Sequence, residues 1–315
     1  YGWFGAKRLN PKWESSAGGT MKKKQWILWV VIFIALAIVG LLIYRQATGK
    51  SLGIKSTIRT ILNVVKATVQ SNEVTKYNQG DFTNILFVHH SVGRFLIEGG
   101  ELRSRLQNEG YTFWDQDYSY EGLTKPDGTP AGYSYFIPND NTDIDGFADI
   151  FQQREYSIPI NALSSFLQHE VILIKSCYPN SAIQDDAELE LRKQQYMTMR
   201  SRMDQYPNHI FIILTSPPLN PAETNPEDAR RARELTSWLA APEFTKGHPN
   251  LFVFNFFDLL AESDPSASDY NMLRSAYREG TDSHPNILAN QEIGPILVNF
   301  ITDSINSYKN TIPNN

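Results

Sequence analysis

Most of the chain alternates short apolar runs with longer amphipathic segments. The apolar runs begin near Asn84 and have the length and composition of buried strands. They are Ile85–Val88, Tyr111–Trp114, Val171–Lys175, Ile210–Leu214 and Leu251–Asn255. The segments between and after them predict helices at 93–108, 161–169, 184–205, 226–240 and 287–306.

This alternation predicts the fold class and the place of a functional site. Strands that alternate with helices are typical of an α/β domain, in which helices cover both faces of a parallel sheet. The stretch 115–158 lacks periodicity, so we expect a long irregular segment there. Ligands of such sheets bind at the carboxyl ends of the strands, so the residues directly after each strand are the first candidates for function.

A different pattern occupies the start of the chain. Residues 26–44 are nineteen residues without a charge, close to the about 20 that a helix needs to cross a bilayer. Lys22, Lys23 and Lys24 precede them, which favours a cytoplasmic N-terminus and a main domain outside the cytoplasm. The alternative is a secreted protein with a cleaved signal peptide, whose apolar region is usually about 7–15 residues.

The remaining segments complete the predicted organisation. Met21-Lys22-Lys23-Lys24 resembles the natural start of an exported protein, and Ala17–Thr20 can be encoded by a purine-rich, ribosome-binding sequence of a bacterial gene. We therefore expect a translated leader at 1–20, cytoplasmic lysines and a transmembrane anchor at 21–45, a juxtamembrane helix and linker at 46–80, the main domain at 81–309 and a tail at 310–315.

Charge and cysteine content exclude several classes of protein. The net charge of −5 combines a basic start with an acidic body, because residues 1–80 carry twelve basic and two acidic side chains and the rest carry seventeen and thirty-two. An acidic body argues against nucleic acid as a partner. The expected partner is the membrane, because of the apolar run at 26–44. The single cysteine, Cys177, excludes a disulfide framework and a thiolate metal cluster. No oligomeric state is indicated.

Two strand-end or loop motifs carry candidate chemistry. Ser91, in His89-His90-Ser91-Val92-Gly93, follows the first strand, where a serine can be a nucleophile beside the amides of the next helix or simply that helix's N-cap. His284 precedes the last helix in Asp282-Ser283-His284-Pro285-Asn286. It can act as a base that Asp282 orients, or the pair can be ordinary surface and turn residues.

This ordering resembles the SGNH hydrolases, also called GDSL-type esterases and lipases. Their nucleophilic serine follows the first strand, and a late Asp-x-x-His-Pro element supplies the other two triad residues. The resemblance covers about 82–306, rests on Ser91, His284 and the Pro217-Pro218 pair, and is nearest to a divergent bacterial branch with His-His-Ser-x-Gly in place of Gly-Asp-Ser. It implies a flavodoxin-like three-layer α/β/α sandwich, here preceded by the transmembrane helix.

The resemblance also implies an oxyanion hole and marks two departures. It assigns the oxyanion to the Ser91 and Gly122 amides and the Asn180 side chain, with Ser176 as the alternative to Asn180. Here His90 stands where the family has the aspartate of its first block. Asp282 precedes His284 by two residues, whereas the family spacing is three.

Several neighbours of these motifs have two interpretations. His90, Ser176 and Cys177 lie next to the expected site, and Cys177 is either a reactive thiol or a small core residue. A metal site formed by His89 or His90 with Asp282 and His284 is the alternative to a serine enzyme, although adjacent strand residues point to opposite sides. Aromatic residues of 111–136 either line a substrate site or pack the core.

These observations together predict a membrane-anchored serine ester hydrolase outside the cytoplasm. It needs no metal or organic cofactor, and an O-acylated glycan is the substrate that family and location imply. Two alternatives remain: a non-catalytic or acyl-transferring glycan-binding protein of the same fold, and a metal-dependent hydrolase.

Overall fold

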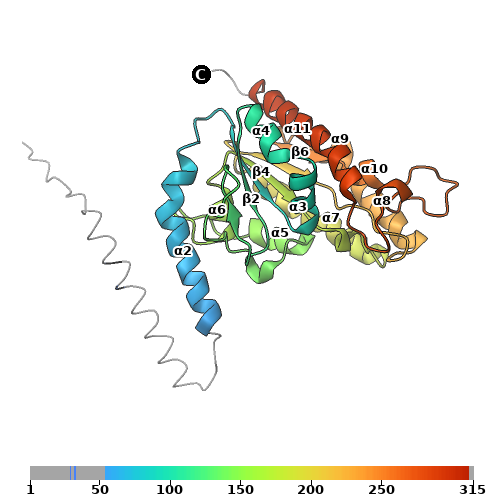
Figure 1. Ribbon diagram of the computed structural model, residues 1–315, viewed down its shortest axis with the longest axis horizontal. Coiled ribbons are helices and arrows are strands. Elements are labelled where there is room, and N and C mark those ends of the chain that lie inside the picture. Colours follow the sequence, from blue (N-terminus) through green and yellow to red (C-terminus); the bar gives the residue numbers. More distant parts are fainter. Residues whose placement is uncertain (1–28, 30–31, 33–53, 312–315) are drawn as a thin grey trace, which may run out of the picture. The chain divides into compact units, whose positions relative to one another are not determined.

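The five apolar runs form five strands of a six-stranded sheet (Figure 1). The structure is a computed structural model that describes Trp29, Ile32 and residues 54–311. Its strands are β1 (Asn84–Val88), β2 (Thr112–Gln116), β3 (Leu123–Thr124), β4 (Val171–Lys175), β5 (Ile210–Leu214) and β6 (Leu251–Phe254). Their spatial order is β3-β2-β1-β4-β5-β6, and only β2–β3 is antiparallel.

Strand order explains where a site can form. Counted along the chain, the five parallel strands lie in the order 2-1-3-4-5, which is the doubly wound order of flavodoxin-like proteins. The order reverses between β1 and β4, so the segments that leave these two strands diverge to opposite faces and open a crevice at their carboxyl ends. The expectation of a purely parallel sheet is wrong at the edge, because the short β3 pairs back on β2.

Helices cover both faces of the sheet, as the alternation predicts. Ile85 and Phe87 face one apolar cluster, whereas Leu86 and Val88 face the other. On the first side lie α3 (Ser91–Gly99), α4 (Leu102–Asn108), α10 (Phe256–Leu260) and α11 (Ile287–Lys309). On the second lie α5 (Ile144–Phe151), α6 (Ala162–Phe166), α7 (Asp186–Met203), α8 (Pro226–Ala240), α9 (Pro242–Thr245) and Ala67 and Val74 of α2 (Ile54–Thr75).

Two expected segments differ from the structure. The helix predicted at 93–108 is two helices, because the chain turns at Gly100 and at Glu101, whose φ is 54°. The stretch 115–158, expected to be irregular, contains β3 and helix α5. Helix α5 is only eight residues long, so its polar face, formed by the exposed Asp145 and Asp149, makes too short a pattern to stand out in the sequence.

The predicted membrane anchor at 26–44 lies outside the described residues except for Trp29 and Ile32, as does the predicted leader at 1–20. Among the helices that the structure describes, none combines the length and apolar character of a membrane span.

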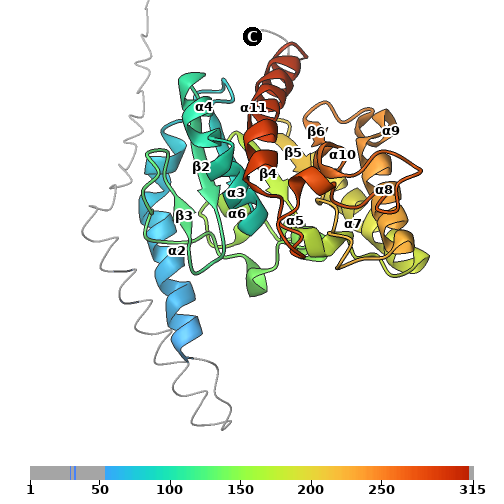
Figure 2. The same cartoon turned by 45° about the vertical axis from the view of Figure 1, so that its right-hand side comes forward.

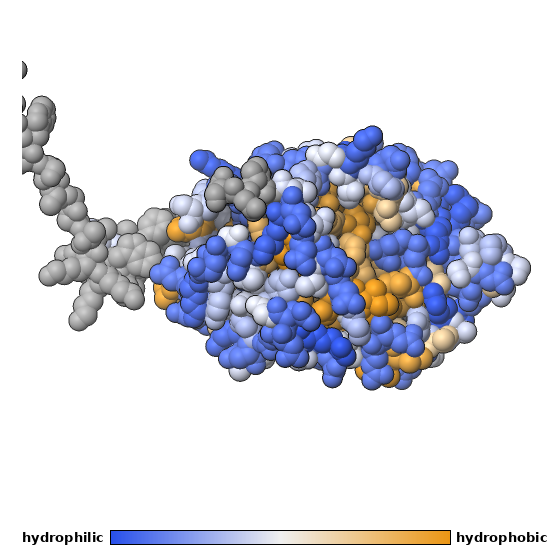
Figure 3. Space-filling model, turned by 90° about the horizontal axis from the view of Figure 1, so that it is seen from above, coloured by the Kyte–Doolittle hydropathy of each residue, from blue (hydrophilic) through white to orange (hydrophobic). Residues whose placement is uncertain are grey.

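Hydrophobic residues do reach the surface of the domain. In Figure 3 they gather near the middle of the face seen from above, framed by hydrophilic ones.

Helices α3 and α11 touch backbone to backbone, and Figures 1 and 2 show them running side by side. A Cβ on Gly294 would lie 2.4 Å from the Cα of Gly100, and one on Gly100 would lie 2.8 Å from the Cα of Gly294. Both distances are far inside van der Waals contact, and main-chain atoms cannot rotate away. Glycine at both positions therefore sets how closely α11 approaches the end of α3.

We expect Gly294→Ala to lower the free energy of unfolding by about 1–3 kcal/mol, because the added methyl must push two helices apart. Urea titration followed by circular dichroism measures this change. Asn299→Ala is the matched control, since it places an alanine on an exposed face of the same helix. Equal stability of Gly294→Ala and the wild type would contradict the close contact.

Candidate active site

Ser91 is the first residue of helix α3, and only His89 and His90 separate it from the end of β1. The side chain of the N-cap residue, His90, makes no hydrogen bond to the first amides of the helix. The turn is tight because Gly93 has no side chain: a Cβ there would lie 2.3 Å from the Cβ of His89. The glycine of the His-His-Ser-x-Gly motif therefore lets the helix begin directly at the strand end.

Ser91, His284 and Asp282 form one hydrogen-bonded chain. The Oγ of Ser91 lies 2.8 Å from Nε2 of His284, although 193 residues separate them in sequence. On the other side of the ring, Nδ1 lies 2.7 Å and 2.9 Å from the two carboxylate oxygens of Asp282. A carboxylate only accepts, so Nδ1 carries a proton and donates it. In the neutral ring Nε2 is then the acceptor for the Ser91 hydroxyl.

The pKa of the Asp282 carboxyl is consistent with an ionised partner. Partial burial alone would raise this pKa, but the hydrogen bonds from the His284 ring and backbone outweigh burial and lower it. The carboxylate therefore stays charged beside the imidazole and can accept the hydrogen bond from Nδ1.

Hydrogen bonds of Ser283 fix the position of the loop that carries Asp282 and His284. In an extended segment, side chains two residues apart point to the same side, and the residue between them points away. Ser283 is fully buried, accepts a 2.8 Å hydrogen bond from the backbone of Asn220 and donates to Glu223. The Asn220 side chain also donates to the carbonyls of Asp282 and Gly280, at 3.0 Å and 3.2 Å.

This arrangement explains how a spacing of two residues can function. With one residue between them, Asp282 and His284 project together, and the bidentate contact at Nδ1 needs no further loop residue. Sequence reasoning missed Asn220 and Ser283. The signal for Asn220 was its position just after the Pro217-Pro218 pair that follows β5.

Two aromatic rings and one thiol surround the imidazole. Phe95, one turn after Ser91, and Tyr178 each contact the His284 ring edge-on, at centroid distances of 5.4 Å and 4.8 Å. Burial, followed by the negative charges of Asp282 and Glu223, raises the pKa of the Tyr178 hydroxyl. The Sγ of Cys177 lies 3.9 Å from the Ser91 Oγ, so this residue borders the site as expected.

The two histidines before Ser91 point to different partners. His89 is buried, with Nε2 3.3 Å from Asp115, which also pairs with Arg103. Burial would raise the pKa of Asp115, but these two partners outweigh it and lower that pKa. His90 stacks on Tyr118 at a centroid distance of 3.7 Å, and its Nδ1 lies 3.0 Å from the Thr142 hydroxyl.

His90, His89 and His284 do not converge on one point. Within the described part of the chain, no three His, Cys, Asp or Glu side chains come close enough together to hold a metal ion. The donor arrangement thus gives no support to the metal-dependent alternative, in which His89 or His90 joins Asp282 and His284.

In the structure, the two expected oxyanion donors make hydrogen bonds to other groups. The amide of Gly122 donates to the carbonyl of Tyr118 at 2.8 Å and closes a turn. The side-chain amide of Asn180 donates to Asp143 at 2.6 Å and to the carbonyl of Cys177 at 3.3 Å, and so attaches the start of α5 to the segment after β4. Neither group is a free donor for an oxyanion.

The end of β4 places Ser176 and Lys175 inside the protein. Ser176 is buried, and its carbonyl accepts a 3.0 Å hydrogen bond from the Lys175 ammonium. Lys175 is buried as well and does not reach the surface, and its burial lowers its pKa.

The aromatic residues of 111–136 have two kinds of surroundings. Trp114, Tyr133 and Tyr135 pack in the core, whereas Tyr118 stacks with the exposed Tyr120.

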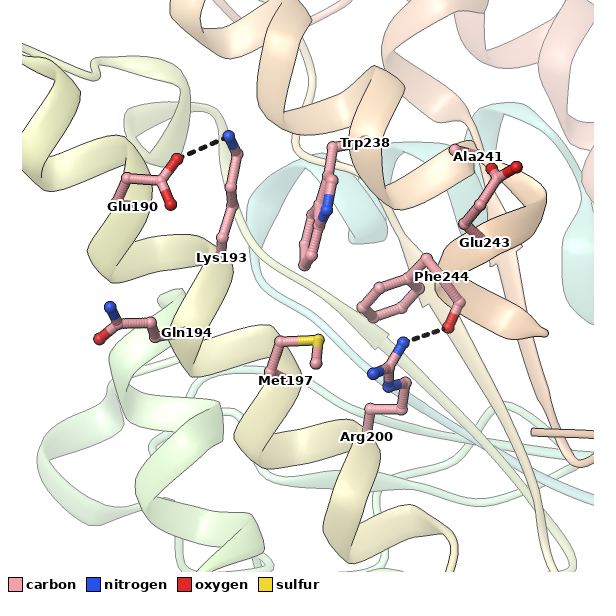
Figure 4. Close-up of a pocket in the computed structure, with 9 residues that line it drawn as sticks. All are labelled: Glu190, Lys193, Gln194, Met197, Arg200, Trp238, Ala241, Glu243 and Phe244. Atoms are coloured by element: carbon pink, nitrogen blue, oxygen red, sulfur yellow. Dashed lines mark hydrogen bonds and ion pairs between the residues drawn. The ribbon is translucent and has the colours of Figure 1, made fainter. Parts of the chain in front are cut away.

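Two of the hollows on the described surface are candidates for ligand binding. One, of about 310 Å³, is lined by residues that include Phe95, Asp282 and His284. The other, of about 690 Å³, lies between α7 and α8–α9 around Trp238 and Phe244 (Figure 4). Although larger, the second hollow contains none of the residues that follow the strands. The smaller one adjoins the Ser91–His284–Asp282 chain and is the better candidate for substrate binding.

Comparisons with known proteins identify no family for this chain. No family model and no curated protein matches the sequence. Among solved structures, a "putative acylhydrolase" from Bacteroides fragilis aligns with a TM-score of 0.45 and 12% identity, over 78% of this chain and 96% of that one. A "putative platelet activating factor" from Streptococcus pneumoniae aligns with a TM-score of 0.44 and 12% identity, over 77% and 94%.

We expect His90 to stay neutral from pH 5 to 8, because burial lowers its pKa to about 4. As the pH falls, the unfolded chain binds a proton at this histidine before the folded chain does. The contribution of neutral His90 to the free energy of unfolding is therefore lost as the pH falls from about 6.5 toward 4. NMR titration of the imidazole, assigned with His90→Gln, measures the midpoint.

Tyr118→Ala uncovers one face of the ring and should move this midpoint upward by about one unit. The control is Tyr156→Ala, which removes an exposed tyrosine that stacks on Arg154. A midpoint near 6.5 in the wild type would contradict the burial of His90.

Proposed function

We propose that this protein is a serine ester hydrolase of the SGNH type, in which Ser91 is the nucleophile, His284 the general base and Asp282 the residue that orients it. One observation carries the proposal: Ser91 Oγ and His284 Nε2 lie 2.8 Å apart while Nδ1 of the same ring lies 2.7 Å from Asp282. Nucleophile, base and orienting carboxylate in hydrogen-bond reach are the arrangement that activates a hydroxyl.

The proposed reaction follows from the proton positions. As Ser91 Oγ attacks the ester carbonyl carbon, its proton moves to Nε2 of His284, and the charge of Asp282 stabilises the imidazolium. The tetrahedral intermediate collapses when the bond to the alcohol oxygen breaks and Nε2 returns the proton to that oxygen. Water then attacks the acyl-serine with the same base, and releases the acid and free Ser91.

The start of α3 is the place for the developing oxyanion. Because the cap residue His90 makes no side-chain hydrogen bond to the first amides of α3, the amides of the first turn, including that of Ser91, keep their donors. The positive end of the helix dipole adds to their effect. We therefore propose the Ser91 amide, and not Gly122 or Asn180, as the oxyanion donor.

The location and the substrate class are part of the same proposal. The length of the apolar run at 26–44 and the lysines before it support an anchor that places the hydrolase outside the cytoplasm, or secretion after cleavage. At such a location, an O-acylated glycan is the proposed substrate.

We expect Ser91→Ala and His284→Ala each to lower kcat for p-nitrophenyl acetate by at least about 10³-fold, and Asp282→Asn by a comparable factor. Ser91→Ala should also abolish labelling of the full chain by a serine-directed fluorophosphonate. Stopped-flow absorbance and in-gel fluorescence measure the two effects.

The chain offers matched controls for each change. Ser104→Ala removes an exposed serine of α4, and His248→Ala removes a surface histidine whose Nδ1 lies 2.6 Å from Asp204 with no serine beside it. Both should keep wild-type rates, and Cys177→Ala should keep the label. Equal hydrolysis and labelling by all variants would rule out the serine mechanism.

A further inference from the structure

The hollow beside His284 has walls from three parts of the fold. Phe95, Glu98 and Gly99 come from α3, and Ile287 and Asn290 from α11. The loop before α11 closes it with Glu279, Asp282, His284, Pro285 and Asn286. At about 310 Å³ it is at the small end of the range of ligand pockets, which is about 300–1,000 Å³.

The proposed mechanism, on which this inference rests, determines which part of a substrate reaches the hollow. His284 Nε2 must return its proton to the alcohol oxygen, so this oxygen lies within hydrogen-bond reach of the ring when the ester bond breaks. The alcohol portion therefore lies on the side of His284, and the acyl portion stays at Ser91 and the start of α3. The hollow is lined by His284 itself and by Phe95, which is one turn after Ser91 and contacts the imidazole.

The charges around the hollow all have one sign. Glu98, Glu279 and Asp282 line it, and no lysine or arginine does. Glu98 and Glu279 are exposed, and among the described residues their carboxylates make no ion pair or side-chain hydrogen bond. Elsewhere on the surface, carboxylates of helices α4 and α7 are neutralised by neighbours, as in Glu101–Arg105 and Glu190–Lys193.

The hollow also offers apolar contact. Phe95 is 39% exposed and Ile287 is 61% exposed, although both are large hydrophobic residues. Carboxylates next to exposed apolar and aromatic side chains suit an organic cation with a low cost of desolvation, such as a quaternary ammonium group. A negatively charged alcohol would meet the carboxylates of Glu98 and Glu279, whereas the carboxylate of Asp282 is bonded to His284.

From these contacts we propose that the hollow beside His284 is the binding site for the alcohol portion of the ester, and that it selects alcohols bearing a positive charge. Glu98 and Glu279 supply the selectivity, and Phe95 and Ile287 supply the apolar contact. The scissile bond and the proton movements are those of the proposed mechanism, and only the choice of leaving alcohol is added.

A pair of esters with the same shape and different charge tests this proposal. The acyl group is the one whose p-nitrophenyl ester the protein hydrolyses fastest. The choline ester and the 3,3-dimethylbutyl ester of this acyl group differ only in a nitrogen that is replaced by carbon. We expect kcat/KM for the cationic ester to exceed that for the neutral one by about tenfold at low salt, since each exposed carboxylate contributes about threefold at such distances. This ratio should fall as salt rises.

Variants locate the effect in the hollow. In Glu98→Gln/Glu279→Gln the ratio of the two kcat/KM values should fall about tenfold, toward one. Glu190→Gln/Glu243→Gln, which removes two carboxylates from the other hollow (Figure 4), should keep the wild-type ratio. A wild-type ratio near one, or the same ratio in Glu98→Gln/Glu279→Gln as in the wild type, overturns the proposal.

Binding of the alcohols alone separates this proposal from the proposed function. Choline and 3,3-dimethylbutan-1-ol are titrated into the full chain while the Ile287 methyl signals are followed by NMR. Tighter binding of choline that Glu98→Gln/Glu279→Gln abolishes supports the subsite even if no ester is hydrolysed through Ser91. Equal binding of the two alcohols overturns it, even if Ser91-dependent hydrolysis is found.

Discussion

The backbone contact between Gly100 and Gly294 is the constraint on which the site depends. Ser91 begins α3, and His284 lies just before α11, so the relative position of these helices decides whether the two side chains meet. Both helices pack on the same face of the sheet, and two glycines let their main chains touch. A side chain at either position would separate the helices and, with them, a hydrogen bond of 2.8 Å.

Positions along the chain were predictable where the physics is local. Strands β4 and β5 begin and end where the apolar runs do, because strands buried on both faces are apolar throughout. Ser91 could be proposed because the carboxyl ends of parallel strands meet at one edge of a sheet, and His284 because it stands with Asp282 in the loop before the last helix. Helix α5 and the break at Glu101 were missed, since a helix of eight residues and a single left-handed residue leave little trace in hydrophobic periodicity.

The parts of the site that escaped prediction depend on contacts between distant segments. Nothing near Ser283 in the sequence shows that Asn220 and Glu223 hold it, and nothing near Phe95 shows that its ring contacts His284. The assignments of Gly122 and Asn180 rested on resemblance alone. Their donors are occupied by a turn and by the start of α5, which a sequence cannot show.

The distance in sequence between Ser91 and His284 has a consequence for how the protein is made. Ser91, the proposed nucleophile, emerges from the ribosome 193 residues before His284, the proposed base, and His284 is positioned only when α11, the last helix described, packs against α3. In the proposed mechanism, a partly synthesised chain would therefore carry a serine no more reactive than any other. The proposed hydrolysis would begin only with the final docking step, so the order of synthesis itself would protect acylated molecules that the growing chain meets.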